Sequence, residues 1–284
     1  MTVLTVSKPE LVWSAGAILG EGPVWQASAG VLYWLDIKGC KLHAYAPETG
    51  QQQTWEADEP IGCITVPEGD GTFLAATQSG FARLALGDNG TVVREPLLAP
   101  EAESLPGNRF NDGKSAPDGS FWAGTMDNAE QADTGSWWRF DPLTQTAAQL
   151  DTGYRVTNGP AFDASSARVY LTDSARQRVF VADWIEGAGF ANKRVFLQFA
   201  DGDGYPDGMQ VHSDGSLWIA FWDGACLRRF SPDGTLIQSV DLPVQRPTSL
   251  AFAPDRNEVY VTSASIGLDD PNPWQGGLLR LSLS

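Results

Sequence analysis

The segment PDGSFWAGT (residues 117–125) joins a polar turn to an apolar run, and this pairing decides the fold because it recurs along the chain. The turn residues are typical of a tight hairpin, and the aromatic-rich run that follows is typical of a strand. Six copies occur: SAGVLYWLD (28–36), GDGTFLAAT (69–77), PDGSFWAGT (117–125), SSARVYLTD (165–173), SDGSLWIAF (213–221) and PDRNEVYVTS (254–263). Such internal repetition indicates an architecture built from equal units.

One apolar run precedes each turn and another follows each repeat, so every unit supplies at least three strands. A fourth, more polar run follows in five units, at 53–58, 91–98, 146–153, 193–200 and 235–243. The sixth unit lacks it, while KPELVWSAG (8–16) near the N-terminus belongs to no unit. We therefore predict an all-β, six-bladed β-propeller with four antiparallel strands per blade, in which the N-terminal strand completes the last blade.

Two β-sandwich domains are the alternative, because they also produce evenly spaced short strands. That arrangement leaves the N-terminal run at 8–16 without a role, and no shift in composition marks a domain boundary. We expect a single propeller domain over residues 1–284.

The composition points to a small-molecule partner. The chain has 19 Lys and Arg against 35 Asp and Glu, a net charge of −16, which disfavours nucleic acid and anionic membrane surfaces. It has no run of apolar residues long enough for a membrane span and no secretory signal, so we expect a cytoplasmic protein. The three cysteines, Cys40, Cys63 and Cys226, have no disulfide or zinc spacing, and we expect small buried side chains.

A ring of equivalent positions follows from the repeat. The first strand of each propeller blade lines the central channel, so its starting residues should meet at one mouth. Counting seven residues back from the first turn residues (Ser28, Asp70, Asp118, Ser165, Asp214 and Asp255) gives Glu21, Cys63, Asn111, Asn158, Asp207 and Thr248. Four of these six carry a carboxylate or a carboxamide.

These polar positions predict a metal site. A buried carboxylate needs a partner, and no Lys or His occupies the other ring positions. One cation would satisfy Glu21, Asp207 and the amide oxygens of Asn111 and Asn158 together. Oxygen ligands suit Ca²⁺, Mg²⁺ or Mn²⁺, and Zn²⁺ or Fe²⁺ where waters complete the shell. The alternative is that they are ordinary turn residues.

Histidine is nearly absent. His43 and His212 both lie outside the ring, where we expect packing or surface roles. A Ser-His-Asp triad and a histidine base are therefore disfavoured, and a carboxylate is the candidate base.

The chain also resembles the family of SMP-30, gluconolactonases and related sugar-lactone hydrolases. The resemblance is carried by LGEGPVW (19–25), NRFNDGKSAPDGSFWAGTM (108–126), TNGPAF (157–162), NKRVF (192–196) and YPDGM (205–209). It implies a propeller with one metal held by Glu21, Asn158 and Asp207. It also implies that Arg109 and Asn111 face the substrate, with Asp112 beside them and Glu130 as a further contact from the loop at 127–135.

The resemblance implies metal-dependent hydrolysis of a sugar acid lactone, such as glucono-, xylono-, arabino- or galactonolactone, to the open-chain acid. Asp207 is the first candidate for the base that activates water, and Asp112 is the second. The alternatives are a phosphotriesterase- or paraoxonase-like hydrolase on the same scaffold, a non-catalytic calcium-binding propeller and a protein-binding platform.

Overall fold

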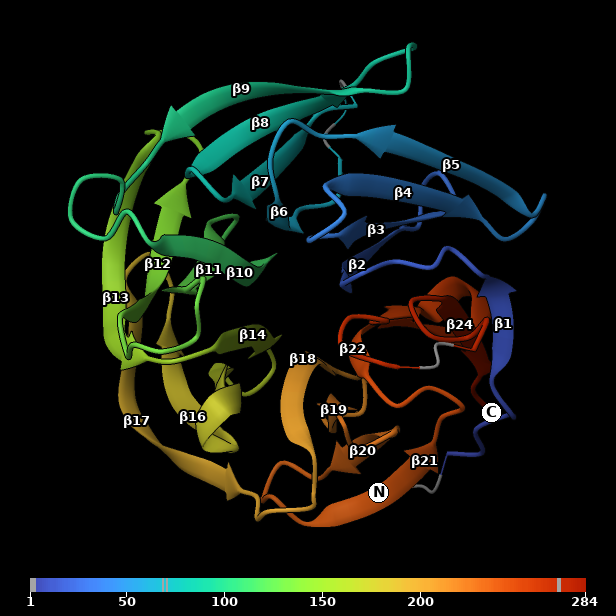
Figure 1. Ribbon diagram of the computed structural model, residues 1–284. Helices are drawn as coiled ribbons and strands as arrows, with labels where there is room; N and C mark the ends of the chain where they lie inside the picture. The colour runs from blue at the N-terminus through green and yellow to red at the C-terminus, as the bar shows by residue number, and fades with distance from the viewer. Residues whose placement is uncertain (1–3, 68, 70, 270–271) are drawn as a thin grey trace.

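The computed structural model is a six-bladed β-propeller, with six four-stranded antiparallel sheets arranged around a central channel (Figure 1). It describes residues 4–67, 69, 71–269 and 272–284, so Asp70 of the second repeat lies outside the described residues. Apart from two single-turn 3-10 helices, η1 (Ser174–Arg176) and η2 (Pro254–Arg256), the described part contains strands, turns and loops. None of its helices is long and apolar enough to cross a membrane.

In blades 1 to 5, the strand nearest the channel comes first in the chain and the outermost strand last. Blade 1 contains β2 (Gly20–Gln26), β3 (Val31–Asp36), β4 (Lys41–Ala46) and β5 (Gln51–Glu56). Blade 2 contains β6 (Ile61–Ile64), β7 (Phe73–Thr77), β8 (Phe81–Leu86) and β9 (Val92–Leu98). Blade 3 contains β10 (Asn108–Ser115), β11 (Phe121–Asp127), β12 (Gly135–Asp141) and β13 (Thr146–Tyr154).

The second half of the chain repeats this arrangement. Blade 4 contains β14 (Thr157–Asp163), β15 (Arg168–Asp173), β16 (Arg178–Ile185) and β17 (Gly189–Gln198). Blade 5 contains β18 (Tyr205–Val211), β19 (Leu217–Trp222), β20 (Cys226–Phe230) and β21 (Leu236–Asp241). Blade 6 contains β22 (Pro247–Ala253), β23 (Glu258–Ser263), β24 (Leu278–Ser282) and the N-terminal strand β1 (Glu10–Trp13).

The two ends of the chain share blade 6, as the leftover N-terminal run predicted. β1 pairs with β24 in antiparallel register, with Leu11 opposite Leu279. Trp13 then packs edge to face against Trp34 of blade 1, with ring centroids 5.5 Å apart. The first segment of the chain thus closes the ring through backbone hydrogen bonds and through packing against the neighbouring blade.

The hydrophobic core lies between neighbouring blades. Leu35 of β3 and Ile61 of β6, for example, belong to one buried cluster, which blades 1 and 2 build together. Four tryptophans in this core are fully buried: Trp34, Trp122, Trp137 and Trp218. Truncating a buried Trp costs about 3–5 kcal/mol, so these side chains contribute strongly to holding the blades in place.

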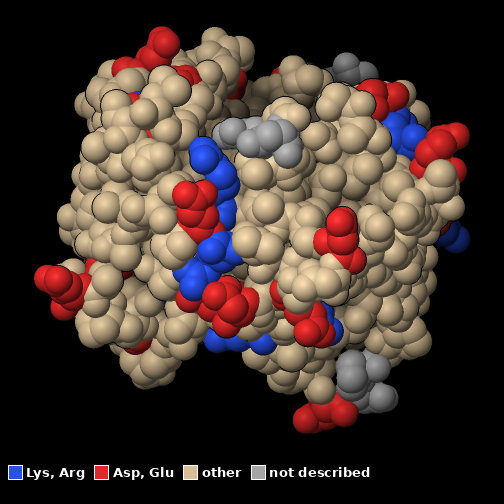
Figure 2. Space-filling model, turned by 90° about the horizontal axis from the view of Figure 1, so that it is seen from above, with Lys and Arg blue, Asp and Glu red and all other residues tan. Residues whose placement is uncertain are grey.

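The three cysteines differ in burial, and the visible surface carries charges of both signs. Cys63 and Cys226 are buried, whereas Cys40 is only partly buried in the turn between β3 and β4, so the expectation of a buried side chain was wrong for Cys40. All three are free thiols. On the face shown in Figure 2, basic side chains lie beside acidic ones rather than forming a basic patch.

Candidate active site

A bulge interrupts every innermost strand at its predicted ring position. In β2, for example, Glu21 pairs with Leu35 and the next paired residue is Val24, so Gly22 and Pro23 are skipped. The same break in pairing occurs in the five other inner strands, at Ile61/Cys63, Phe110/Asp112, Asn158/Ala161, Pro206/Met209 and Pro247/Ser249. A bulge re-aims a side chain out of the regular alternation, and here six bulges surround one channel mouth.

Local backbone geometry explains why glycine follows two of the ring residues. Gly22 has φ +54, a left-handed conformation that a side chain rarely adopts. Gly208, directly after Asp207, lies so close to Ser249 of β22 that a Cβ atom would fall 2.2 Å from its Oγ. These glycines let neighbouring inner strands approach closely where the functional side chains emerge.

The channel mouth opens into a pocket of about 480 Å³. Among its lining residues are six of the seven predicted site residues: Glu21, Arg109, Asn111, Glu130, Asn158 and Asp207. Cys63 and Thr248, the ring positions without a carboxylate or amide, do not line it. Trp222 lines the pocket as well. Trp25 does not line it, and its ring stacks on that of Tyr260. The volume is in the range of small-molecule sites.

Two carboxylates in this pocket lie in an environment that disfavours their charge. Glu21 and Asp207 are only 5% and 6% exposed. Burial, reinforced by the negative charge of Asp112, raises the pKa of Glu21 to about 8. Burial and the negative charges of Glu21 and Asp112 raise the pKa of Asp207 well above its usual value. Among the described residues none of the three forms an ion pair with Lys or Arg, although Lys114 and Arg109 act on Glu21 from a distance.

The amide of Asn158 is held in a defined orientation. The Ser174 hydroxyl donates to the carbonyl oxygen of Pro206 at 2.6 Å, so its oxygen accepts from Asn158 Nδ2 at 2.8 Å. This arrangement leaves Asn158 Oδ1 on the opposite side of the amide, where it accepts from Asn111 Nδ2 at 3.2 Å. An amide oxygen so oriented is available as a metal ligand.

Arg109 and Asn111 form one buried unit. Arg109 Nη1 donates to Asn111 Oδ1 at 2.7 Å and to the carbonyl oxygen of Phe110 at 3.0 Å. Asn111 Nδ2 donates to the carbonyl oxygen of Thr157 at 2.7 Å as well as to Asn158. The predicted substrate-facing pair is therefore linked by hydrogen bonds to the candidate ligand Asn158.

Asp112 is bound to backbone. Its Oδ1 accepts from the N–H of Gly113 at 2.7 Å and its Oδ2 accepts from the N–H of Gly159 at 2.8 Å. It is only 2% exposed and, unlike the other predicted site residues, does not line the pocket. It ties β10 to the bulge of β14, directly beside Asn158.

The donor set fits one divalent cation. Glu21 and Asp207 supply two buried carboxylates and Asn158 an oriented amide oxygen, all lining one pocket. Among the described residues no group of three or more His, Cys, Asp and Glu side chains could hold a metal, so a cation in this pocket would need a neutral oxygen such as Asn158 Oδ1 beside the two carboxylates. A hard cation with waters in its remaining positions suits such a set, and its charge would offset the cost of burying both carboxylates.

Two polar residues of the pocket region carry no signal in the sequence. Lys38, in the turn between β3 and β4, lines the pocket, and its Nζ donates to Asn128 Oδ1 at 3.2 Å. Asn128, in the loop after β11, also accepts from Arg109 Nε at 3.1 Å. This contact crosses from blade 1 to blade 3, and only the folded ring brings these residues together.

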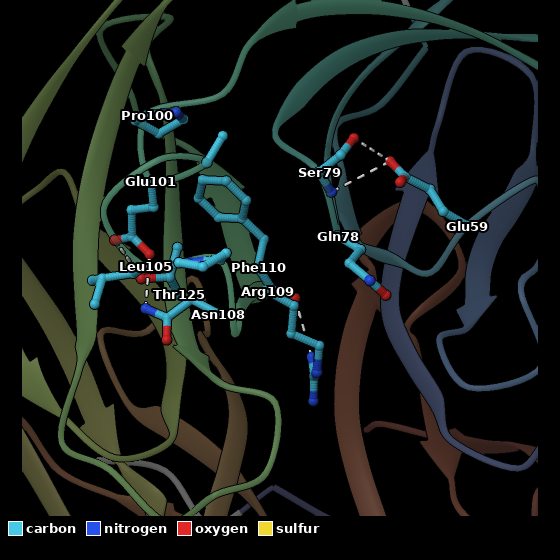
Figure 3. Close-up of a pocket in the computed structure, with 12 residues that line it drawn as sticks. Glu59, Gln78, Ser79, Pro100, Glu101, Leu105, Asn108, Arg109, Phe110 and Thr125 are labelled. Carbon is cyan, nitrogen blue, oxygen red and sulfur yellow. Dashed lines mark hydrogen bonds between the residues drawn. The ribbon is translucent and has the colours of Figure 1, made fainter.

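A second, smaller pocket of about 260 Å³ shares Arg109 and lies beside blades 2 and 3 (Figure 3). Its two acidic residues are already satisfied. Glu101 accepts from Asn108, Thr125 and Trp138, and Glu59 accepts from Thr77 and Ser79. Figure 3 shows the Arg109 side chain pointing away from both carboxylates. These acids stabilise the loops rather than pair with Arg109.

The fold and the pocket define a class: a six-bladed propeller with a small-molecule pocket and oxygen donors at one mouth of its channel. The chain belongs to the family described as the SMP-30/Gluconolactonase/LRE-like region, whose profile matches residues 19–265. The resemblance seen in its motifs is thereby confirmed.

Relatives are similar over nearly the whole chain. Regucalcin of Xenopus laevis is 32% identical over 287 residues, which cover 97% of this chain and 94% of that protein. Pentonolactonase XacC of Haloferax volcanii is 34% identical over 277 residues, covering 94% and 91%. The structure of a calcium-binding protein, regucalcin, from Agrobacterium tumefaciens superimposes with a TM-score of 0.89 at 25% identity, covering 97% and 93%.

Proposed function

We propose that this protein is a metal-dependent lactonase that opens a sugar acid lactone, such as a glucono-, xylono-, arabino- or galactonolactone. The observation that carries the proposal is that two buried carboxylates and one oriented amide oxygen, from Glu21, Asp207 and Asn158, line a single pocket of monosaccharide scale. A relative named as a pentonolactonase, similar over almost the full length, supports the same activity.

Glu21, Asn158 and Asp207 would hold the metal. A divalent cation bound there supplies an electrophile that stabilises negative charge on the lactone carbonyl oxygen and lowers the pKa of water, effects worth several kcal/mol. Ca²⁺, Mg²⁺, Mn²⁺, Zn²⁺ and Fe²⁺ are all compatible with oxygen ligands and waters.

Hydrolysis adds water across the acyl–oxygen bond. The water oxygen bonds to the carbonyl carbon, the ring oxygen leaves as a hydroxyl group, and the product is a carboxylic acid. Asp207 accepts the proton of the attacking water and returns it to the leaving ring oxygen. Asp112 is the weaker candidate for this role because both of its oxygens already accept backbone N–H groups.

Arg109 and Asn111 would orient the sugar. Arg109 is buried to 4% exposure and lines the pocket, so its remaining N–H groups can donate to hydroxyl oxygens. Asn111 connects it to Asn158, which couples the position of the substrate to the position of the metal. Glu130, on the loop after β11, lines the same pocket and is the third candidate contact.

A pH-indicator assay tests the proposal. Gluconolactone, xylonolactone and a phosphotriester are each supplied to metal-loaded protein with and without EDTA. We expect acid release from the lactones alone and its loss on chelation. Asp207→Ala and Asn158→Ala should lower kcat/KM by at least about a hundredfold, whereas Arg109→Ala should mainly raise KM. Full activity of Asp207→Ala in EDTA contradicts the assignment of the site.

A non-catalytic calcium-binding propeller is the second candidate, favoured by the name of the Agrobacterium tumefaciens relative. It predicts metal binding without lactone turnover. The same assay separates the two, because metal uptake measured by calorimetry together with no acid release from any lactone supports the second candidate.

A further inference from the structure

Basic as well as acidic side chains line the pocket of this acidic protein. Four basic side chains line it: Lys38, Arg109, Arg155 and Arg246. Two of them have their own acidic partners, since Arg155 pairs with Asp133 and Arg246 with Asp223. The other two, Lys38 and Arg109, form no such ion pair with a described acidic residue.

Arg109 is a buried cation on which the charges of Glu130 and Glu21 act only from a distance. It donates hydrogen bonds to neutral oxygens: Asn128 Oδ1, Asn111 Oδ1 and the carbonyl oxygen of Phe110. Within the described ranges of the chain it forms no ion pair. Burial lowers the pKa of Arg109, which reflects the cost of holding this charge away from water. A buried, unpaired charge of this kind calls for a ligand of opposite sign.

Lys38 adds a second cation on the same pocket wall. Its Nζ and Arg109 Nε share the acceptor Asn128 Oδ1, at 3.2 and 3.1 Å, so Asn128 holds the two positive groups near one another. Lys38 likewise forms no ion pair among the described residues. Burial and the charge of Arg109 lower the pKa of Lys38, so the two cations repel each other.

Glu130 is the acidic residue that acts on both cations. Its charge favours the protonated forms of Lys38 and Arg109, yet it pairs with neither. Once a divalent cation offsets Glu21 and Asp207, two unpaired positive groups face one negative group in this pocket. The balance remains positive.

We propose that Lys38 and Arg109, positioned by Asn128, form a subsite for an acidic substituent on the substrate. The preferred lactone then carries a phosphate, sulfonate or carboxylate group on the carbon beyond the ring, which the two cations bind while the ring carbonyl lies at the Glu21–Asn158–Asp207 site. This inference rests on the proposed lactonase function and names its substrate class.

Matched substrates test this subsite. Gluconolactone and 6-phosphogluconolactone differ only in the group at carbon 6, and glucarolactone places a carboxylate there. With metal-loaded wild type we expect kcat/KM to be about tenfold higher for the two acidic lactones, the usual scale of a charged hydrogen bond. Raising NaCl from about 20 mM to about 300 mM should reduce this preference by screening.

Three variants test the contribution of Lys38 to this subsite. Lys38→Met should lower kcat/KM for the acidic lactones about tenfold, mostly through KM, with a loss of about twofold for gluconolactone. Lys38→Arg should restore most of the preference. Lys8→Met removes an exposed charge just before β1. It should leave kcat/KM unchanged for the neutral and the acidic lactones.

Two results overturn the inference, and they differ from failure of the proposed function. Equal or lower kcat/KM for the acidic lactones, or equal losses for all three substrates in Lys38→Met, removes the acidic subsite while lactone hydrolysis stands. No turnover of any lactone removes both. As a measurement independent of turnover, 6-phosphogluconate should bind metal-loaded wild type more tightly than gluconate, and Lys38→Met should abolish that difference.

Discussion

Asn158 Nδ2 donates to Ser174 Oγ at 2.8 Å, and this one contact decides which atom of the amide faces Asn111 and the pocket. Ser174 also donates to the carbonyl of Pro206, the residue before Asp207. A serine on the single-turn helix η1 therefore aligns an amide on β14 with the bulge of β18 that presents a carboxylate. Two of the three candidate metal ligands share this support.

Replacing Ser174 should weaken metal binding without unfolding the protein. In Ser174→Ala the amide of Asn158 loses its fixed orientation, and outer-shell changes of this kind typically cost about 10- to 100-fold in metal affinity. Calorimetric titration of the apo protein measures the change. Ser7→Ala, at an exposed serine, is the matched control and should bind as the wild type does. Unchanged affinity in Ser174→Ala would show that the hydrogen bond does not orient a ligand.

The sequence was sufficient for the architecture because every blade repeats the same local signal. Each turn precedes a strand that packs against its neighbours, so the six units, the closure by β1 and the ring of inner positions could all be predicted. The ring positions could be predicted by counting back from the turns because a bulge occurs at the corresponding place in every inner strand.

The support of the site could not be predicted in the same way. Ser174, Lys38 and Asn128 lie on turns and loops without a repeated spacing, and their partners are in other blades or far along the chain. The sequence also placed Asp112 beside the substrate residues, but not its two backbone contacts, because these depend on how the bulge of β14 lies against β10. Such contacts come from tertiary packing and leave no periodic pattern.

Metal should stabilise the folded protein strongly. A ligand that binds only the folded state at a hundred times its Kd adds about 2.7 kcal/mol, so the melting temperature should rise with added Ca²⁺ or Mn²⁺ and fall in EDTA. In Asp207→Asn this dependence should disappear. The metal-free variant should be at least as stable as the metal-free wild type, because it no longer buries a carboxylate between Glu21 and Asp112. A metal-dependent melting temperature in Asp207→Asn would contradict the ligand assignment.

Asp112 should matter for stability as well as for the site. Asp112→Ala leaves the N–H groups of Gly113 and Gly159 without their acceptors in a buried position. Each of the two unpaired groups costs about 1–3 kcal/mol, so the free energy of unfolding should fall by about 2–6 kcal/mol. Urea unfolding measures this change. Asp88→Ala, at an exposed aspartate in the turn between β8 and β9, should cost less. A loss below about 0.5 kcal/mol in Asp112→Ala would mean that the backbone contacts are not holding the strands.

His43 is a buried imidazole between two tryptophans. It lies in β4, its ring centroid is 5.0 Å from that of Trp13 and 4.3 Å from that of Trp34, and it is 4% exposed. Its Nδ1 pairs with Thr54 Oγ1 at 2.9 Å, while its Nε2 has no hydrogen-bond partner in the described part of the structure. Burial lowers the pKa of His43 from 6.5 to about 4.

This lowered pKa should make the protein sensitive to mild acid. Above pH 6.5 His43 is neutral in both states, but between pH 6.5 and about pH 4 the unfolded chain takes up a proton that the folded protein excludes. The free energy of unfolding should therefore fall by about 3 kcal/mol over this window because of His43. In His43→Leu that part of the pH dependence disappears, so the difference in stability between variant and wild type should shift in favour of the variant as the pH falls. His212→Asn, which leaves the buried imidazole in place, should keep the acid sensitivity. Urea unfolding from pH 7.5 down to pH 4 measures all three proteins, and parallel pH profiles for wild type and His43→Leu would show that the imidazole is protonated without cost in the folded state.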